Sequence, residues 1–328
     1  MKICVIGDGG WGTANALLLA GYGHEVTLWG AFPDYVEEMR RTRRNDRFLK
    51  GVALPGNLAL AADRAEAVRG AAVVVLAPPS KYFSAVVGGF RGLVDGRHLV
   101  VSLTKGLCET SNRRMTELAE EALGVTGVVA LAGPTHAEEV ARGIPTAIVA
   151  ACADEARAKA VQRIWSGPAF RVYTSADPVG VEIGGAVKNV IAIAVGCSDG
   201  MGFGDNTRAA LITRGLAELK RFVLAYGGRP ETLSGLAGIG DLIVTCTSVH
   251  SRNHAVGERL GRGERIGDIL GSMQMVAEGV WNSRVVRRLA SELGVEMPIC
   301  DLVYRLCHEG FDARAAVAEM MGRELKAE

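Results

Sequence analysis

The first half of this chain alternates short apolar runs with amphipathic segments, and this alternation limits the available folds more than any other feature. Amphipathic stretches such as residues 113–123 and 154–165 carry apolar side chains at helical spacing. Between such stretches lie runs that have the length and composition of buried strands: residues 3–6, 26–29, 71–77, 98–103, 128–132, 147–151 and 170–173. Strands that alternate with helices predict a doubly wound α/β domain with a mainly parallel sheet.

The pattern changes after Asp177-Pro178, where long helical segments replace the alternation. The predicted helices of this second part are residues 181–195, 208–226, 276–293, 299–308 and 313–325. A length of 328 residues suits two domains. We therefore predict a Rossmann-like domain at residues 1–178 and an all-helical domain at residues 179–328. No low-complexity linker separates them, so we expect the domains to pack tightly around a shared cleft.

Composition excludes several classes of protein. Basic and acidic residues balance at 37 against 36, so no global charge draws the chain to nucleic acid or to an anionic membrane. The 7 cysteines are scattered without a C-x-x-C pair, which is typical of buried thiols in a reducing compartment. No signal peptide or membrane-spanning run is evident, so we expect a cytoplasmic protein without stable membrane insertion.

A glycine motif, Gly7-Asp8-Gly9-Gly10-Trp11-Gly12, follows the first predicted strand directly. It fits G-x-G-x-x-G, but glycine is so abundant, at 42 residues, that the string alone is a weak signal. Its placement is more informative, because it opens a predicted helix over residues 13–19 whose N-terminal amides would hold a pyrophosphate. We favour dinucleotide binding over a plain strand-to-helix turn.

The choice between NAD and NADP stays open. A dinucleotide site normally has an acid about 20 residues further on, or a basic residue that accepts a 2′-phosphate. Here the second strand ends in Trp29-Gly30-Ala31-Phe32, with neither. The nearby Arg40, Arg41, Arg43 and Arg44 are interleaved with acidic residues and are more typical of a solvated helix face.

Lys188 and Asn189 lie inside an otherwise small and apolar helical segment, residues 184–193. Burial lowers the pKa of a lysine, which would suit proton transfer near neutral pH. The alternative is a lysine that extends to solvent from the helix edge. Because Gly184 and Gly185 lie one turn earlier and would let a ligand approach, we favour the functional interpretation.

Further polar clusters follow glycine turns or strand ends. Asp241 follows Gly238-Ile239-Gly240, and we expect residues 242–244 to be buried after it. Ser251-Arg252-Asn253 opens a helix and matches a phosphate or diphosphate group, although an ordinary N-cap with a surface arginine is as plausible. Thr104-Lys105-Gly106 and Gly133-Pro134-Thr135-His136-Ala137 stand at the carboxyl ends of strands, where such sheets bind ligands.

No metal site is predicted. His250 and His254 are four residues apart, but they lack the glutamate of a metalloprotease helix and a third ligand. We interpret them as polar residues of a loop and a helix start.

Taken together, these segments resemble the bacterial type of NAD(P)-dependent glycerol-3-phosphate dehydrogenase, over nearly the whole chain. The segments that carry the resemblance are residues 7–14, 104–107, 133–137, 184–193, 206–215, 238–245 and 251–253. The resemblance implies reversible reduction of dihydroxyacetone phosphate to sn-glycerol 3-phosphate with NADH or NADPH and no metal, feeding glycerophospholipid synthesis. A homodimer is a possible assembly of this chain.

The resemblance also implies roles for individual residues. Lys188 would exchange the proton at the substrate oxygen, and the catalytic group would further include Lys105, Asn189, Asp241 and Thr245. The residues that would contact substrate are Lys105, Gly133, Thr135, Lys188, Asp241, Ser251, Arg252 and Asn253. Those that would contact the cofactor are Gly7, Gly9, Gly10, Trp11, Gly12, Lys105, Ala137, Arg252, Val276 and Glu278.

One position departs from the family pattern. Relatives that use NADPH often carry arginine or histidine at the position matching Ala31, while Phe32 is similar to a phenylalanine of NAD-using eukaryotic relatives. The sequence therefore leans weakly to NAD. Two other interpretations remain: a related dehydrogenase of the hydroxyacid or ketopantoate type, and a regulator that senses dinucleotide without catalysis.

Overall fold

A computed structural model describes residues 1–273 and 275–325, so residue 274 and residues 326–328 of the predicted helical domain lie outside the described part. The N-terminal domain is built on one sheet of eight strands in the order β3-β2-β1-β4-β5-β6-β7-β8. Neighbouring strands are parallel except β6 and β7, which are antiparallel. The strands are β1 (Lys2–Ile6), β2 (Glu25–Trp29), β3 (Ala59–Ala61), β4 (Val73–Leu76), β5 (Leu99–Ser102), β6 (Val129–Ala132), β7 (Thr146–Ala151) and β8 (Phe170–Ser175).

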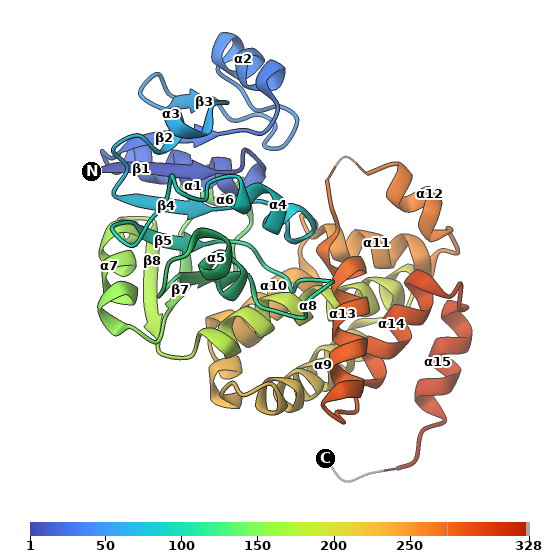
Figure 1. Ribbon diagram of the computed structural model, residues 1–328. Coiled ribbons are helices and arrows are strands. Elements are labelled where there is room, and N and C mark those ends of the chain that lie inside the picture. The colour runs from blue at the N-terminus through green and yellow to red at the C-terminus, as the bar shows by residue number, and fades with distance from the viewer. Residues whose placement is uncertain (274, 326–328) are drawn as a thin grey trace.

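Helices cover both faces of the sheet, which confirms the doubly wound prediction (Figure 1). Successive side chains of a strand point to opposite faces. Ile3 and Val5 accordingly pack in one apolar layer, and Cys4 and Ile6 pack in the other. The helical elements of this domain are α1 (Gly10–Gly21), α2 (Pro33–Thr42), α3 (Arg64–Val68), η1 (Ser80–Tyr82), α4 (Phe83–Gly88), α5 (Met115–Leu123), α6 (Ala137–Val140) and α7 (Glu155–Trp165).

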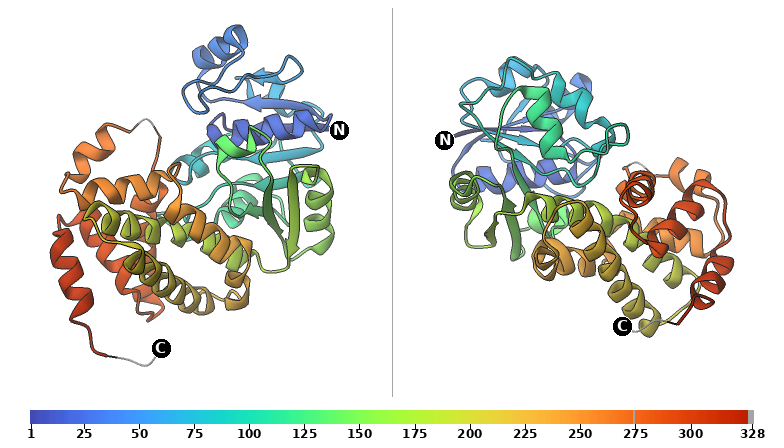
Figure 2. Two further views of the ribbon diagram at one scale, coloured as in Figure 1. Left: turned by 180° about the vertical axis from the view of Figure 1, so that it is seen from behind. Right: turned by 60° about the horizontal axis from the view of Figure 1, so that its bottom comes forward.

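The described residues of the second domain form helices joined by loops, without a strand, as predicted (Figure 2). Asp177 caps its first helix by accepting a hydrogen bond from the Gly180 amide (2.9 Å), and Pro178 takes the first helical position. Its elements are α8 (Pro178–Gly200), α9 (Asp205–Ala225), η2 (Pro230–Ser234), η3 (Leu236–Gly240), α10 (Asp241–Thr247), α11 (Arg252–Gly261), α12 (Ile266–Gly271), α13 (Glu278–Glu292), α14 (Pro298–His308) and α15 (Ala313–Met321). The last predicted helix was too long, because α15 ends before Gly322.

α8 is the central helix of this domain. It is long and apolar enough to cross a membrane by composition, but 89 % of its most apolar window is buried inside the protein. Burial on all sides explains why its sequence is apolar around the whole helix. The cysteines behave as expected from the sequence: all 7 are free, and 6 of them are buried.

Glycines let α11 lie directly against α8. A Cβ on Gly257 of α11 would meet the Ile193 carbonyl oxygen at 2.1 Å, and one on Gly196 of α8 would meet the His254 carbonyl oxygen at 2.1 Å. Contacts this short leave no room for any side chain. Part of the high glycine content therefore serves helix packing.

We predict that Gly257→Ala destabilises the protein by about 1–3 kcal/mol, because the added methyl group must push the two helix backbones apart. Urea unfolding followed by circular dichroism measures the change. Gly267→Ala on α12 is the matched control: its Cβ meets open space, so the variant should keep or gain stability by about 0.5–1 kcal/mol. Equal stability of the two variants would contradict this account of the packing.

Candidate active site

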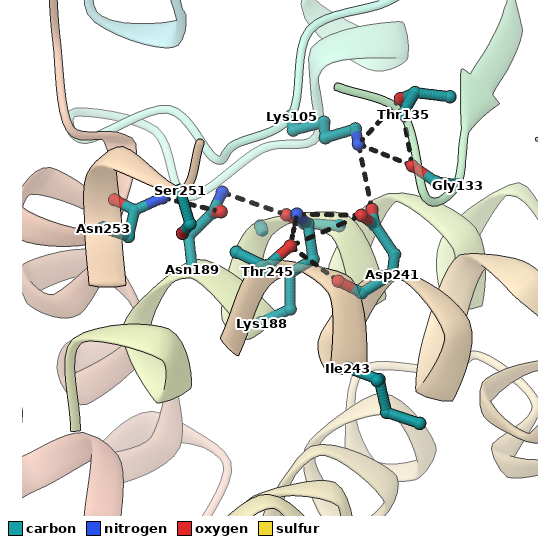
Figure 3. A network of polar contacts seen from close by, with 12 residues as sticks. Lys105, Gly133, Thr135, Lys188, Asn189, Asp241, Ile243, Thr245, Ser251 and Asn253 are labelled. Carbon is teal, nitrogen blue, oxygen red and sulfur yellow. Dashed lines mark hydrogen bonds and ion pairs between the residues drawn. The ribbon is translucent and has the colours of Figure 1, made fainter. Parts of the chain in front are cut away.

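Lys188 of α8 is buried, with 4 % of its surface exposed, which rules out the alternative of a lysine that extends to solvent. Its ammonium lies 3.0 Å from Asp241 Oδ1 and donates to the Thr245 hydroxyl at 2.5 Å. That hydroxyl in turn donates to the Asp241 carbonyl oxygen at 2.6 Å. Both partners belong to α10, whose first turn faces α8 (Figure 3).

Asp241 also binds a second lysine, from the sheet domain. Lys105 follows the carboxyl end of β5, and its ammonium lies 2.9 Å from Asp241 Oδ2. It further donates to the Gly133 carbonyl oxygen at 2.8 Å and to the Thr135 hydroxyl at 3.4 Å, in the loop after β6. One buried carboxylate is thus shared by two ammonium groups, one from each domain (Figure 3). The three groups carry a net charge of +1 when all are ionised, which suits an anionic ligand.

The pKa of Lys188 is lowered from 10.5 to about 8. Burial is the main cause, because it disfavours the charged form, and the positive charge of Lys105 acts in the same direction. Asp241 opposes both effects. Lys188 is therefore poised to gain or lose a proton at slightly alkaline pH, as the sequence argument predicted.

Next to Lys188, a series of amide hydrogen bonds links α8 to α11 and α13. Asn189 donates to the Gly185 carbonyl oxygen at 3.2 Å and accepts from the Asn253 side chain at 2.9 Å. The amide of Gly279 donates to Asn253 Oδ1 at 2.8 Å. Asn253 thereby ties α11 to both α8 and α13, close to the lysine (Figure 3).

The cluster Ser251-Arg252-Asn253 forms an ordinary helix N-cap. Ser251 accepts a hydrogen bond from the His254 amide at 3.2 Å and caps α11. Arg252 is exposed and donates to the Val276 carbonyl oxygen at 2.7 Å. Both residues stand at the end of α11 that adjoins Asn189 and Asn253, so a phosphate role for the cluster stays a prediction.

Two expectations about neighbouring residues were wrong. Gly184 does not open space for a ligand, because a Cβ there would lie 2.7 Å from the Ala237 carbonyl oxygen and the residue serves contact with η3. A Cβ on Gly185 would instead lie 3.7 Å from Lys105 Cγ, so this glycine faces the Lys105 side chain. In the run 242–244, Leu242 is buried but Ile243 is 48 % exposed, because the run is helical and its side chains point in different directions.

The glycine loop has the geometry that a dinucleotide needs. Gly7 has a φ of +113°, and a Cβ on Gly12 would meet the Gly7 carbonyl oxygen at 2.0 Å, so these two glycines shape the turn and seat α1 against it. A Cβ on Gly9 would meet nothing within 4 Å. The second glycine therefore leaves the main chain open to an approaching phosphate, at the N-terminus of α1.

Of the remaining residues expected near the cofactor, three line the approach to this loop or face it from the helical domain. Ala137 begins α6, and its Cβ would lie 3.7 Å from a Cβ on Gly10. Trp11 is partly buried in the first turn of α1. Glu278 begins α13 and accepts a hydrogen bond from the Ser80 amide at 3.1 Å and another from the Ser80 hydroxyl. Burial raises the pKa of the Glu278 carboxyl group.

Sequence reasoning gave no role to two residues of this region. Ser80, in η1, binds Glu278 across the two domains; its place just after β4, at the ligand-binding edge of the sheet, is a signal that could have identified it. His136 lies within a noted motif, and its Nε2 is buried without a hydrogen-bond partner. Burial and the charges of Lys105 and Lys188 lower the pKa of His136, which favours its neutral form. Within the described ranges, no three His, Cys, Asp or Glu residues could hold a metal ion together.

Sequence comparison matches both domains to one family. The family model described as the NAD-dependent glycerol-3-phosphate dehydrogenase N-terminus matches residues 2–158, and the C-terminus model matches residues 177–318. The chain belongs to this family.

Similar proteins cover the whole chain. The glycerol-3-phosphate dehydrogenases (NAD(P)+) of Geobacter sp. strain M21 and Geobacter metallireducens are 48 % and 50 % identical, over 100 % of this chain and 98 % of theirs. The crystal structure of glycerol-3-phosphate dehydrogenase from Coxiella burnetii superposes with a TM-score of 0.94 at 39 % identity, over 98 % of this chain and 99 % of that one. A ketopantoate reductase from Ralstonia eutropha shares only the fold, with a TM-score of 0.61 at 17 % identity.

We predict that Asp241→Asn lowers the pKa of Lys188 further below about 8, because the carboxylate is the group that stabilises the ammonium form. A titration of the Lys188 side chain by 13C NMR on lysine-labelled protein measures the shift. Asp205→Asn is the control, since Asp205 is an exposed carboxylate at the start of α9 that pairs with Arg208. An unchanged pKa of Lys188 in a folded Asp241→Asn protein would show that Asp241 does not stabilise the ammonium form.

Proposed function

We propose that this protein catalyses the reversible reduction of dihydroxyacetone phosphate to sn-glycerol 3-phosphate with NADH or NADPH. The observation that carries the proposal is the buried Lys188, which is held by Asp241 and Thr245 at the junction of the two domains. Family membership supports it, because the full-length relatives carry this activity in their names. A regulator that only senses dinucleotide would need neither the two lysines nor their shared carboxylate.

Lys188 is the residue that we assign to proton transfer at the substrate oxygen. Its ammonium gives a proton to the oxygen during reduction, and its neutral amine takes one back during oxidation. Asp241 and Thr245 keep the amine in one position, and Lys105 adds a second positive charge where negative charge develops on that oxygen. Asn189 positions the cluster through its hydrogen bond to Asn253.

We assign the substrate phosphate to the polar groups at the start of α11. Ser251, Arg252 and Asn253 bring a hydroxyl, a guanidinium and an amide to one helix N-terminus, a combination that suits a phosphate. Lys105, Gly133 and Thr135 would complete the substrate site on the sheet side. Binding energy from the phosphate would hold the carbonyl group at Lys188.

The cofactor would lie on the glycine loop, with Gly7, Gly9, Gly10, Trp11 and Gly12 beneath it and Ala137 beside them. From the other side, Lys105, Arg252, Val276 and Glu278 would contact it. When bound, a nicotinamide cofactor supplies or accepts the hydride of this reaction. The open main chain at Gly9 is the feature of this chain that fits the pyrophosphate.

The remaining expectations form part of the proposal. We divide the chain at Pro178, the first residue of α8, into domains of residues 1–178 and 179–328. We further propose that the protein is cytoplasmic, forms a homodimer and supplies glycerol 3-phosphate to glycerophospholipid synthesis.

The proposed reaction is tested by initial rates with NADH and with NADPH. Dihydroxyacetone phosphate should be reduced, whereas dihydroxyacetone, which lacks the phosphate, should react at least about a hundredfold more slowly because it loses the remote binding energy. Equal rates with the two compounds would instead favour a dehydrogenase for non-phosphorylated carbonyl compounds. Binding of cofactor with no turnover of any carbonyl compound would favour the sensor.

Lys188→Ala should lower kcat by about 10²–10⁴-fold, because it removes the general acid–base group. Binding of NADH, followed by its fluorescence, should be unchanged. Lys220→Ala is a suitable control, since Lys220 lies on α9, which contributes none of the proposed site residues. Full activity of Lys188→Ala would eliminate the proton-transfer role.

The pH dependence of kcat should have opposite signs in the two directions. Reduction needs the protonated lysine, so its rate should fall as the pH rises through the pKa of about 8. Oxidation needs the neutral amine, so its rate should rise over the same range. Rate profiles from pH 6 to 10 at saturating substrate, with deuterated and ordinary cofactor to identify the chemical step, measure both. Parallel profiles would contradict the role of Lys188.

A further inference from the structure

The carboxyl end of β2 lacks the acid that commonly binds the adenine ribose of a dinucleotide. β2 ends at Trp29, and Gly30, Ala31 and Phe32 follow. At this edge of the sheet, β2 lies beside β1, with Ile6 paired to Trp29. The glycine loop that follows β1 therefore adjoins the position from which the acid is missing.

The side chain of Asp8, in the glycine loop, fills that position. A Cβ on Gly30 would lie 2.6 Å from Asp8 Oδ2 and 2.8 Å from Val36 Cγ2, so the carboxylate and Val36 together occupy the space that a side chain on residue 30 would enter. Asp8 is only 7 % exposed, and its Oδ2 is buried with no hydrogen-bond partner. A buried carboxylate oxygen without a donor is costly in a native protein, so this oxygen calls for a ligand.

The main chain of Asp8 is fixed, and this aims its carboxylate. The Asp8 carbonyl oxygen accepts a hydrogen bond from the Asn45 side-chain amide at 2.7 Å and another from the Thr13 hydroxyl at 3.1 Å. Asn45 also donates to the Thr13 hydroxyl at 2.7 Å. These bonds join the glycine loop, α1 and the segment after α2.

Most of the arginines on this side have other partners. Arg40 donates to the Leu60 carbonyl oxygen at 2.6 Å, Arg43 donates to that of Leu54 at 3.2 Å, and Arg44 pairs with Asp46 at 2.9 Å. Arg47 stacks over the Phe32, Tyr35 and Phe48 rings, 5.1–5.7 Å from their centroids, and its positive charge lowers the pKa of Asp8.

The charge state of the Asp8 carboxyl group suits the role of a hydrogen-bond acceptor. Burial raises the pKa of Asp8 to about 6, while its own main-chain amide and Arg47 hold it down. The carboxyl group is thus mostly ionised at pH 7.5 and accepts hydrogen bonds rather than donating them.

We propose that Asp8 replaces the missing acid of β2: its carboxylate accepts a hydrogen bond from the 2′-hydroxyl of the adenine ribose and makes this enzyme prefer NAD over NADP. A 2′-phosphate would bring two negative charges against a buried carboxylate, which disfavours NADP. The inference rests on the proposed function only in requiring that a nicotinamide dinucleotide binds the glycine loop.

The test measures binding without substrate, by titration calorimetry with NADH, NADPH and 2′-deoxy-NADH. The wild type should bind NADH at least about tenfold more tightly than either analogue, since a hydrogen bond to a charged group is worth that factor or more. Asp8→Ala and Asp8→Asn should bind NADH and 2′-deoxy-NADH alike, and their preference for NADH over NADPH should fall about tenfold or more.

Glu38→Gln is the matched control for charge alone, because it removes an exposed carboxylate from neighbouring α2 and should leave all three affinities within about twofold. Thermal unfolding should show both Asp8 variants folded, because neither substitution places a larger side chain in this buried position. An unchanged NADH to 2′-deoxy-NADH ratio in the Asp8 variants, or an equal loss of affinity for all three nucleotides, would overturn the inference while leaving the proposed reaction intact. Failure of the wild type to bind any of them would overturn both.

Discussion

The site depends on the sharing of one carboxylate, that of Asp241, between two lysines from different domains. Burial in the apolar core of the helical domain lowers the pKa of Lys188, and the charge of Lys105 lowers it further. Asp241 offsets part of that cost and fixes both ammonium groups within 3.0 Å of its oxygens. The free energy of docking the sheet domain on the helical domain therefore depends on the charge states of these three groups.

This arrangement explains why the lysine is placed on α8 rather than on a loop. α8 is buried on all sides, so a polar group on it is held by neighbours from several helices and keeps one position. Thr245 and Asp241 reach it from α10, and Asn253 reaches the adjacent Asn189 from α11. Thr245 and Asn253 are in turn bonded to main chain, at Asp241 and at Gly279, so these two side chains have little freedom to rearrange.

Local sequence patterns were sufficient to predict the architecture, but they did not predict which side chains of the site pair with one another. Apolar runs identified seven of the eight strands; β3 was missed, because Ala59–Ala61 is too short and alanine-rich to differ from a loop. Lys188 was recognisable because a charged residue in an apolar helix needs an explanation. Its partners were not, since the bond from Lys105 to Asp241 spans 136 residues and no periodicity encodes a contact at that separation.

The role of each glycine follows from its position in the fold and not from the high glycine content as such. In the loop after β1 they leave main chain open, whereas on α8 and α11 they let two helix backbones touch. The second use bears on the site as well, because a Cβ on Gly279 of α13 would meet the Asn189 carbonyl oxygen at 2.4 Å. Only with helices this close can the Gly279 amide reach Asn253 and Asn253 reach Asn189. The absence of a side chain at these glycines is thus what lets the few polar side chains of the site meet.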